Sequence, residues 1–208
     1  MFDENDGYFD HVPPPCAPSL RADLSPAGAS TVDDAAERYV VDGGVFGPGP
    51  RVPMTIVSPW SRGGWVDSQA FDHTSLIRFI EQRFGVSEPN ISPWRRAVMG
   101  DLTSAFDFRH PNRKPFLVYP QLTRQQANAV RNAQQALPQV PIPLGSAGSF
   151  PVQAQGTRPS RALPYKLHVD SQELLDSVQL TFRVTGAQAA VFHVYDRRDL
   201  AAVPRRYT

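Results

Sequence analysis

Proline sets the tightest limits on the fold of this chain, because 21 of its 208 residues are proline and most of them cluster at 13–18, 48–59 and 138–164. Proline lacks a backbone N–H and has a fixed φ, so it is excluded from helix interiors and from the central strands of sheets. These three stretches are therefore predicted to be loops and linkers that divide the chain into shorter folded segments.

The overall composition is that of a globular protein, with 41% hydrophobic and 20% charged residues. A net charge of +1 gives no strong basic field, so we expect no nucleic-acid partner. Cys16 is the single cysteine and excludes an internal disulfide. The N-terminus shows no basic region followed by an apolar stretch, so we expect no targeting signal in this chain.

Acidic side chains are crowded into the first eleven residues, where a chain end normally frays. Such a cluster repels itself unless a cation or hydrogen-bond donors hold it together, so we expect a bound group there. The alternative from spacing alone is a solvated acidic turn or a calcium-binding loop, although the EF-hand spacing is not met. The residues of the cluster are Asp3, Glu4, Asp6, Asp10 and His11.

Local patterns predict several elements in the middle of the chain. A short helix is expected after Ser30 or Thr31, and the apolar run 52–57 is expected to form a buried strand. Residues 76–84 have the apolar spacing of an amphipathic helix that ends at Gly85. Two short helices are expected within 86–110, around Gly100, and a polar helix is expected after Pro120.

The last part of the chain changes to β-branched and aromatic runs, at 165–172, 177–186 and 189–197. Alternation in VQLTFRV places Val178, Leu180, Phe182 and Val184 on one face. We expect meandering antiparallel strands of a small sandwich. Only about three strands are expected, and the chain stops at PRRYT without a closing strand, which is few for a stable sheet.

Two motifs carry a resemblance to a known family. The stretch DENDGYFDHVPPP resembles the Asp-Glu-x-x-Gly-x-x-Asp-His-Val-x-x-Pro motif of the bacterial phospholipase C and acid phosphatase family, and GPRVPMTIVSPW resembles its Gly-x-Arg-Val-Pro motif. The stretch from SPWSRGGW to SAFDF, and the tail from ALPYKLHV onward, resemble the phosphocholine-specific branch of that family. The matching positions are Asp3, Glu4, Gly7, Asp10, His11, Val12 and Pro15, then Gly49, Arg51, Val52 and Pro53.

This resemblance implies an α/β fold, with the C-terminal part of an alkaline-phosphatase-like catalytic domain followed by a partial antiparallel β-sandwich domain. The catalytic part would span residues 1–120, a polar helix and a Pro/Gly/Ser-rich linker residues 121–160, and the start of the β domain residues 161–208. The implied reaction is hydrolysis of phosphatidylcholine to diacylglycerol and phosphocholine. The parent enzyme would be secreted or periplasmic, would use choline phospholipids as substrate and would contact the membrane surface transiently.

The resemblance also assigns the acidic cluster. Asp3 and Glu4 are the candidates for metal binding, while Asp10 and His11 are the candidate catalytic residues that would orient the site. Hard carboxylate oxygens suit a divalent cation, which neutralises charge on a transferring phosphoryl group. The identity of the metal stays open, with calcium as one candidate, and no substrate-binding residue is assigned.

Family members also carry a secretion signal, a Glu-Asn-Arg-Ser-Phe-Asp motif and a separate nucleophile, and none of these occurs in the 208 residues. We therefore expect a C-terminal fragment that begins inside the catalytic domain, ends inside the β domain and is inactive by itself. The alternative is a non-catalytic lipid- or partner-binding module.

The remaining histidines and tryptophans are expected to serve the structure. His73 is expected to cap a helix or to donate a hydrogen bond at the edge of the core, rather than to form a catalytic dyad with Asp72. Structural roles are also expected for His110, His168 and His193. Packing against the sheet is expected for Trp60, Trp65 and Trp94, with stacking on a choline headgroup as the alternative.

Overall fold

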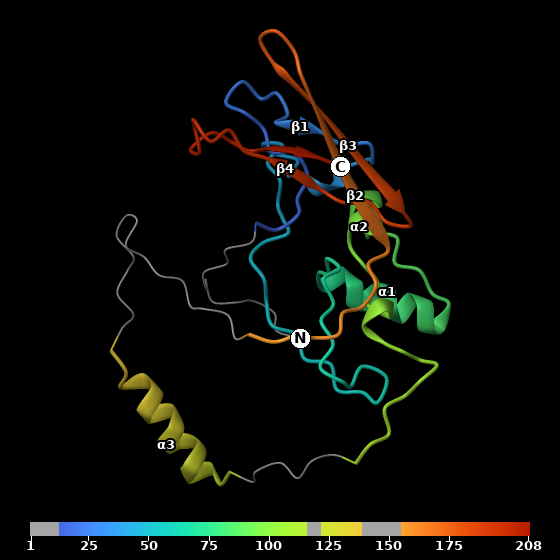
Figure 1. Cartoon of the computed structure of the whole chain (residues 1–208), viewed down its shortest axis with the longest axis vertical. Coiled ribbons are helices and arrows are strands. Elements are labelled where there is room, and N and C mark those ends of the chain that lie inside the picture. Colours follow the sequence, from blue (N-terminus) through green and yellow to red (C-terminus); the bar gives the residue numbers. More distant parts are fainter. Residues whose placement is uncertain (1–12, 116–121, 139–154) are drawn as a thin grey trace. The chain divides into compact units, whose positions relative to one another are not determined.

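The computed structural model describes residues 13–115, 122–138 and 155–208 (Figure 1). It divides the chain into two compact units, one drawn from residues 1–112 and 159–208 and the other from residues 113–158. Helices and small sheets are mixed in the structure, which is compatible with the expected α/β class. The expected domain boundaries at 120 and 160 stay a prediction.

A three-stranded sheet joins the last residues of the chain to a segment near its start. Its order is β1 (Gly28–Ala29), β5 (Arg205–Tyr207) and β4 (Phe192–Val194), with β1 parallel and β4 antiparallel to β5. The expectation that the end of the chain supplies no closing strand is therefore wrong. Only glycine fits at position 28, because a Cβ atom there would lie 1.8 Å from the carbonyl oxygen of Arg206.

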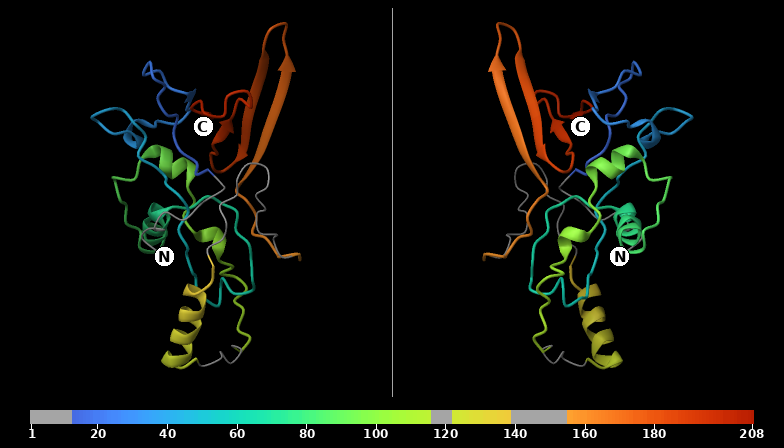
Figure 2. Two further views of the ribbon diagram at one scale, coloured as in Figure 1. Left: turned by 90° about the vertical axis from the view of Figure 1, so that its left-hand side faces the viewer. Right: turned by 90° about the vertical axis from the view of Figure 1, so that its right-hand side faces the viewer.

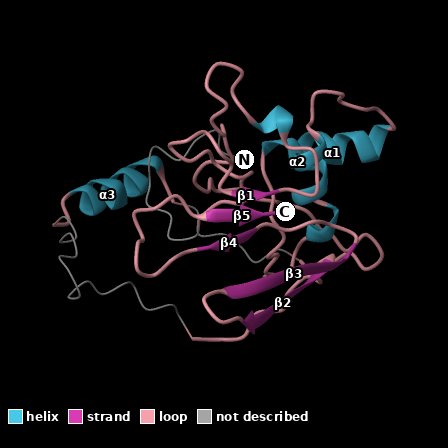
Figure 3. Cartoon of the chain, turned by 90° about the horizontal axis from the view of Figure 1, so that it is seen from above, coloured by secondary structure: helices cyan, strands magenta, loops and turns pink. Residues whose placement is uncertain are grey.

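A long hairpin forms the second sheet, as the alternating pattern predicts. Strands β2 (Tyr165–Glu173) and β3 (Val178–Gly186) pair antiparallel, with Val169 opposite Phe182. The ring of Phe182 stacks on Phe192 at 4.8 Å and on Tyr207 at 5.3 Å between ring centroids. Aromatic stacking on this one side chain thus joins the hairpin to the three-stranded sheet, and Figure 3 shows the two sheets beside each other.

Helix α1 (His73–Phe84) confirms the amphipathic prediction, and Gly85 ends it in the left-handed conformation, with φ 66°. Asp72, and not His73, caps its N-terminus, because the Asp72 side chain accepts hydrogen bonds from the backbone N–H groups of Thr74 and Ser75. The two short helices expected around Gly100 are α2 (Pro93–Val98) and the 3-10 helix η2 (Thr103–Ala105).

Two of the expected elements are not formed. Residues 52–57 make no strand, and Val57 is 80% exposed. A strand needs a partner for its backbone groups, and Pro53 and Pro59 remove two donors from this stretch. The helix expected after Ser30 or Thr31 is reduced to the 3-10 turn η1 (Ala35–Glu37).

The core of the first unit is small and centres on α2. Trp94 is fully buried against Ala17, Val98 and Met99, and its indole N–H donates to the Thr208 hydroxyl at 3.1 Å. Cys16 lies buried nearby, and burial raises the pKa of its thiol although Arg206 acts in the opposite direction. The thiol is therefore held protonated, and a protonated thiol is a poor nucleophile.

An ion network links three segments around this core. The guanidinium of Arg95 in α2 lies 3.0 Å from a carboxylate oxygen of Glu37, which is fully buried, and also pairs with Asp72. The hydroxyl of Ser92 donates to Glu37 and also caps α2 by accepting from the backbone N–H of Arg95. One arginine thus fixes the η1 turn and the cap of α1 relative to α2.

The second unit contains α3 (Arg124–Gln135), which confirms the predicted polar helix. Thr123 caps it, in a capping box with Gln126. Within the described residues of either unit, none of the helices has both the length and the apolar character required to cross a bilayer.

Replacing Arg95 with methionine tests the ion network. We expect Arg95→Met to lower the free energy of unfolding by about 3 kcal/mol, because the Glu37 carboxylate would stay buried without its cation. Urea denaturation followed by circular dichroism measures the change. Arg198→Met is the matched control, because Arg198 pairs with Asp196 at an exposed site and its loss should leave stability unchanged. Equal effects of the two substitutions would contradict the role of the network.

Acid should selectively weaken a second ion pair. Hydrogen bonds from the Arg96 side chain and from the backbone N–H of Glu88 lower the pKa of Glu81 to about 2. A carboxyl group with a lowered pKa in the folded state stabilises the fold above its unfolded pKa, and the contribution disappears as pH falls from about 4.5 to about 2. We expect Glu81→Gln to destabilise the chain at pH 7 and to match the unsubstituted chain at pH 2.

Denaturation curves at several pH values measure this difference. Glu173→Gln on the exposed hairpin is the control, since it removes a carboxylate without removing an ion pair. A stability difference for Glu81→Gln that is constant from pH 7 to pH 2 would show that the pair does not stabilise the fold.

Candidate functional site

The four site residues predicted from sequence, Asp3, Glu4, Asp10 and His11, lie outside the described residues. Their roles stay predictions. Within residues 13–115, 122–138 and 155–208, no three His, Cys, Asp or Glu side chains are grouped so that they could hold a metal ion. The candidate site that the structure does describe is a pocket in the first unit.

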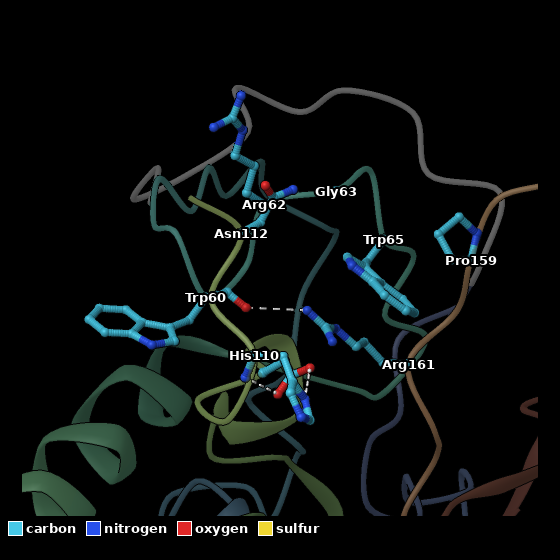
Figure 4. Close-up of a pocket in the computed structure, with 9 residues that line it drawn as sticks. Trp60, Arg62, Gly63, Trp65, His110, Asn112, Pro159 and Arg161 are labelled. Atoms are coloured by element: carbon cyan, nitrogen blue, oxygen red, sulfur yellow. Dashed lines mark hydrogen bonds and ion pairs between the residues drawn. The ribbon is translucent and has the colours of Figure 1, made fainter. Parts of the chain in front are cut away.

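The pocket has a volume of about 380 Å³ and is shown in Figure 4. Three segments of the first unit build it: the turn at 58–65, the loop at 107–112 and residues 159–161. Its lining residues are Trp60, Arg62, Gly63, Trp65, Asp107, His110, Asn112, Pro159 and Arg161.

Backbone hydrogen bonds hold the three segments together. The carbonyl of Trp60 accepts from the N–H of Asp107 at 2.8 Å, and the carbonyl of Pro59 accepts from the N–H of Asn112 at 2.7 Å. Val66 joins the turn to the third segment, because its N–H donates to Pro159 at 2.9 Å and its carbonyl accepts from Arg161 at 2.8 Å. The walls are therefore fixed by paired backbone groups, which are costly to leave unsatisfied when buried.

A ladder of aromatic rings connects the pocket to α1. Phe79 of α1 stacks on Phe106 with ring centroids 5.2 Å apart, and Phe106 stacks on Phe108 at 5.2 Å. Phe108 contacts the ring of Trp60 at 6.0 Å. The position of the turn thus depends on the helix that Asp72 and Arg95 hold in place.

Arg161 is the cation at the centre of the pocket. Its guanidinium lies 4.3 Å from the centroid of the Trp65 ring and donates to the carbonyls of Ala105 at 3.2 Å and Trp60 at 3.4 Å. Its Nε is buried and has no hydrogen-bond partner in the part of the chain that is described. Such a cation–π contact stabilises both groups and fixes the direction of the guanidinium. The same pair, Arg161 and Trp65, also lines a second cavity of about 330 Å³.

An acid and imidazole pair, Asp107 and His110, also lines the pocket. Nδ1 of His110 lies 3.2 Å from a carboxylate oxygen of Asp107, and the backbone N–H groups of Arg109 and His110 donate to the same side chain. Burial alone would raise the pKa of Asp107, but the hydrogen bonds from His110 and Arg109 lower it overall. The ionised Asp107 therefore orients the imidazole ring of His110.

The turn SRGGW (residues 61–65) contains two glycines and positions the side chain of Trp65. Gly63 has φ 140° and Gly64 has φ 69°, so both adopt conformations that favour glycine. A Cβ atom at Gly63 would lie 2.8 Å from the indole nitrogen of Trp65. The two glycines let the chain fold back so that the indole meets Arg161.

The structure agrees with some of the sequence-based interpretations of the aromatic and histidine residues and differs from others. Trp94 is buried, as packing requires, but Trp60 and Trp65 stay partly exposed at the pocket and do not pack on a sheet. His110, for which a structural role is expected, pairs with Asp107 three residues earlier and lines the pocket. Arg161 was not identified from sequence, because its partners are brought to it only by the fold.

Comparison with known proteins finds two family matches in the chain and several similar bacterial proteins named phospholipase C. Residues 1–87 match the phosphoesterase family, and residues 159–208 match the C-terminal domain of bacterial phospholipase C. A non-hemolytic phospholipase C of Pseudomonas aeruginosa is 53% identical over 216 residues, covering 100% of this chain and 30% of the relative. A non-hemolytic phospholipase C of Burkholderia pseudomallei is 47% identical, covering 93% of this chain and 28% of the relative.

A hemolytic phospholipase C of Pseudomonas aeruginosa is 40% identical over 223 residues and is again covered over 30% of its length. The chain thus spans less than a third of the length of these relatives and aligns with a C-terminal part of them. The chain thus contains one segment that matches the phosphoesterase family and a second segment that matches the C-terminal domain of bacterial phospholipase C.

Proposed function

We propose that these residues serve a phospholipase C that hydrolyses phosphatidylcholine to diacylglycerol and phosphocholine. The observation that carries the proposal is the 53% identity, over the whole of this chain, to a protein named non-hemolytic phospholipase C. The same proposal includes an alkaline-phosphatase-like catalytic domain, choline phospholipids as substrates and a secreted or periplasmic location for the whole enzyme.

The proposed chemistry rests on the acidic N-terminal motif, which lies within the phosphoesterase match. Carboxylates are the donors that a hard divalent cation prefers, so Asp3 and Glu4 fit a metal whose charge would offset that of the phosphoryl group. His11 would donate a proton to the leaving alkoxide or a hydrogen bond to a phosphate oxygen, and Asp10 would orient it. Calcium is one candidate for the metal.

The described pocket is proposed to take the phosphate-bearing headgroup. Arg161 supplies a fixed positive charge, and His110 supplies an imidazole whose orientation Asp107 sets. Guanidinium and imidazole groups are the usual partners of phosphate oxygens in proteins. A non-catalytic lipid-binding role is the second candidate, and the exposed apolar hairpin favours it.

A chimera tests the catalytic proposal. It joins the non-aligned part of the Pseudomonas aeruginosa relative to these 208 residues, which replace the aligned C-terminal segment. We expect the chimera to release phosphocholine and the 208-residue chain alone to release none, because the chain lacks the separate nucleophile of the family. Asp3→Asn or Glu4→Gln in the chimera should lower kcat by about 100-fold or more, since each removes a carboxylate of the metal site.

The matched control is Asp170→Asn, which makes the same chemical change on the exposed polar face of β2 and should leave kcat unchanged. Metal-dependent release by the chain alone would overturn the expectation that it is inactive. Full activity of Asp3→Asn and Glu4→Gln in an active chimera would remove both residues from the site.

The role of the pocket is tested in the same chimera with soluble p-nitrophenyl phosphorylcholine. We expect Arg161→Met and His110→Ala each to raise KM about tenfold while changing kcat less, because a hydrogen bond to a charged group contributes about 1.5–3 kcal/mol. Arg161→Lys should recover part of the loss, and the exposed Arg158→Met is the control. An unchanged KM for both variants would exclude the pocket from headgroup binding.

A further inference from the structure

The turn of the long hairpin presents two adjacent leucines to solvent. Residues 174–177 connect β2 to β3, and the N–H of Leu174 donates to the carbonyl of Ser177 at 2.8 Å, which closes the turn. Leu175 is 99% exposed and Leu174 is 48% exposed. Two neighbouring leucines in contact with water cost free energy, so an ordered turn of this kind indicates an apolar partner.

The apolar surface continues from the turn along one face of the hairpin. Cross-strand pairing puts Glu173 opposite Val178, Ser171 opposite Leu180 and Val169 opposite Phe182. Because alternate residues share a face, the exposed apolar side chains of both strands gather on the side that carries Phe182. The exposed members of this face are Leu167, Val169, Val178 and Leu180.

The contacts of Phe182 show where this face is covered and where it is open. Phe182 is covered by Phe192 and Tyr207, whereas Val178, four residues nearer the turn, is 60% exposed. Four strand residues span about 13 Å, so the leucines stand well beyond the covered part. Figure 2 shows the hairpin reaching past the three-stranded sheet of the same unit.

The charges around the turn indicate which kind of lipid surface it would contact. Residues 171–182 contain two acidic side chains, Glu173 and Asp176, and neither lysine nor arginine. Basic residues are what draw proteins to anionic lipids, and acidic residues are repelled by them. A choline phospholipid surface instead carries a quaternary ammonium group in each headgroup, which complements carboxylates placed beside the inserted leucines.

We propose that the turn at 174–177 inserts Leu174 and Leu175 into the surface of a choline phospholipid bilayer, with Glu173 and Asp176 among the headgroups. The choice of a phospholipid bilayer rests on the proposed function. Insertion would hold the chain at the surface in which its substrate lies, and its strength would scale with the apolar area removed from water.

Co-sedimentation with phosphatidylcholine vesicles tests the proposal on the whole 208-residue chain, without catalysis. We expect the chain to bind the vesicles and Leu174→Ser/Leu175→Ser to weaken the partition constant about tenfold or more, because two leucines lose their apolar contact. Leu200→Ser is the matched control, since Leu200 is also largely exposed but lies outside the hairpin, and its binding should be unchanged. Equal loss in both variants, or no loss in either, would overturn the proposal.

Vesicles that also contain phosphatidylglycerol test the charge argument. We expect the unsubstituted chain to bind these anionic vesicles no more strongly than vesicles of phosphatidylcholine alone. The variant Glu173→Lys/Asp176→Lys should bind the anionic vesicles more strongly. Stronger binding of the unsubstituted chain to the anionic vesicles would overturn the proposed headgroup contact. If sedimentation without vesicles shows that the leucine substitutions dissociate a dimer, the occupant of this surface is a second copy of the chain and the proposal fails.

Hydrolysis of the soluble p-nitrophenyl phosphorylcholine separates this proposal from the proposed function. In the chimera, the leucine variant should keep its rate on that substrate and lose rate on phosphatidylcholine vesicles. A chimera that is inactive on the soluble substrate contradicts the proposed function, while vesicle binding by the chain still decides the role of the hairpin.

Discussion

The pairing of Arg95 with two carboxylates is the interaction on which the rest of the first unit depends. A single guanidinium reaches Glu37 in the η1 turn and Asp72 at the start of α1. Because Asp72 also caps α1, the helix begins where the ion pair holds it. The orientation of α1 in turn places Phe79, from which aromatic stacking leads to Trp60 at the pocket. A buried charge network thus acts at a distance on the geometry of the candidate site.

The two segments that match different families share one folded unit. Strand β1 lies in the phosphoesterase match and β5 lies in the phospholipase C C-terminal match, yet they pair directly in one sheet. The Thr208 hydroxyl also accepts from Trp94, and its carbonyl accepts from Thr31. Because a pair of short strands is not stable alone, each segment needs the other to complete its sheet.

The elements that the sequence predicts correctly are those whose signals are local. Asp72, the apolar spacing and Gly85 all lie within or next to α1, and the alternation in β3 sets its faces without reference to a partner. The prediction of short strands fails because their formation depends on pairing with distant segments. Strand β5 is too short to be recognised from sequence. The apolar run at 52–57 forms no strand because it has no pairing partner among the described residues. Arg161 could not be predicted as a pocket residue for the same reason. The residues that it contacts, Trp60, Trp65 and Ala105, are distant from it in sequence.

The position of Arg161 also bears on why the two matched segments occur in one polypeptide. Trp60 and Trp65 come from the phosphoesterase match, whereas Arg161 comes from the start of the C-terminal domain match. The pocket therefore has its aromatic wall in one segment and its central cation in the other. Residues of the C-terminal domain match thus complete a pocket whose other walls include the phosphoesterase segment, so the two matched segments share this pocket as well as the three-stranded sheet.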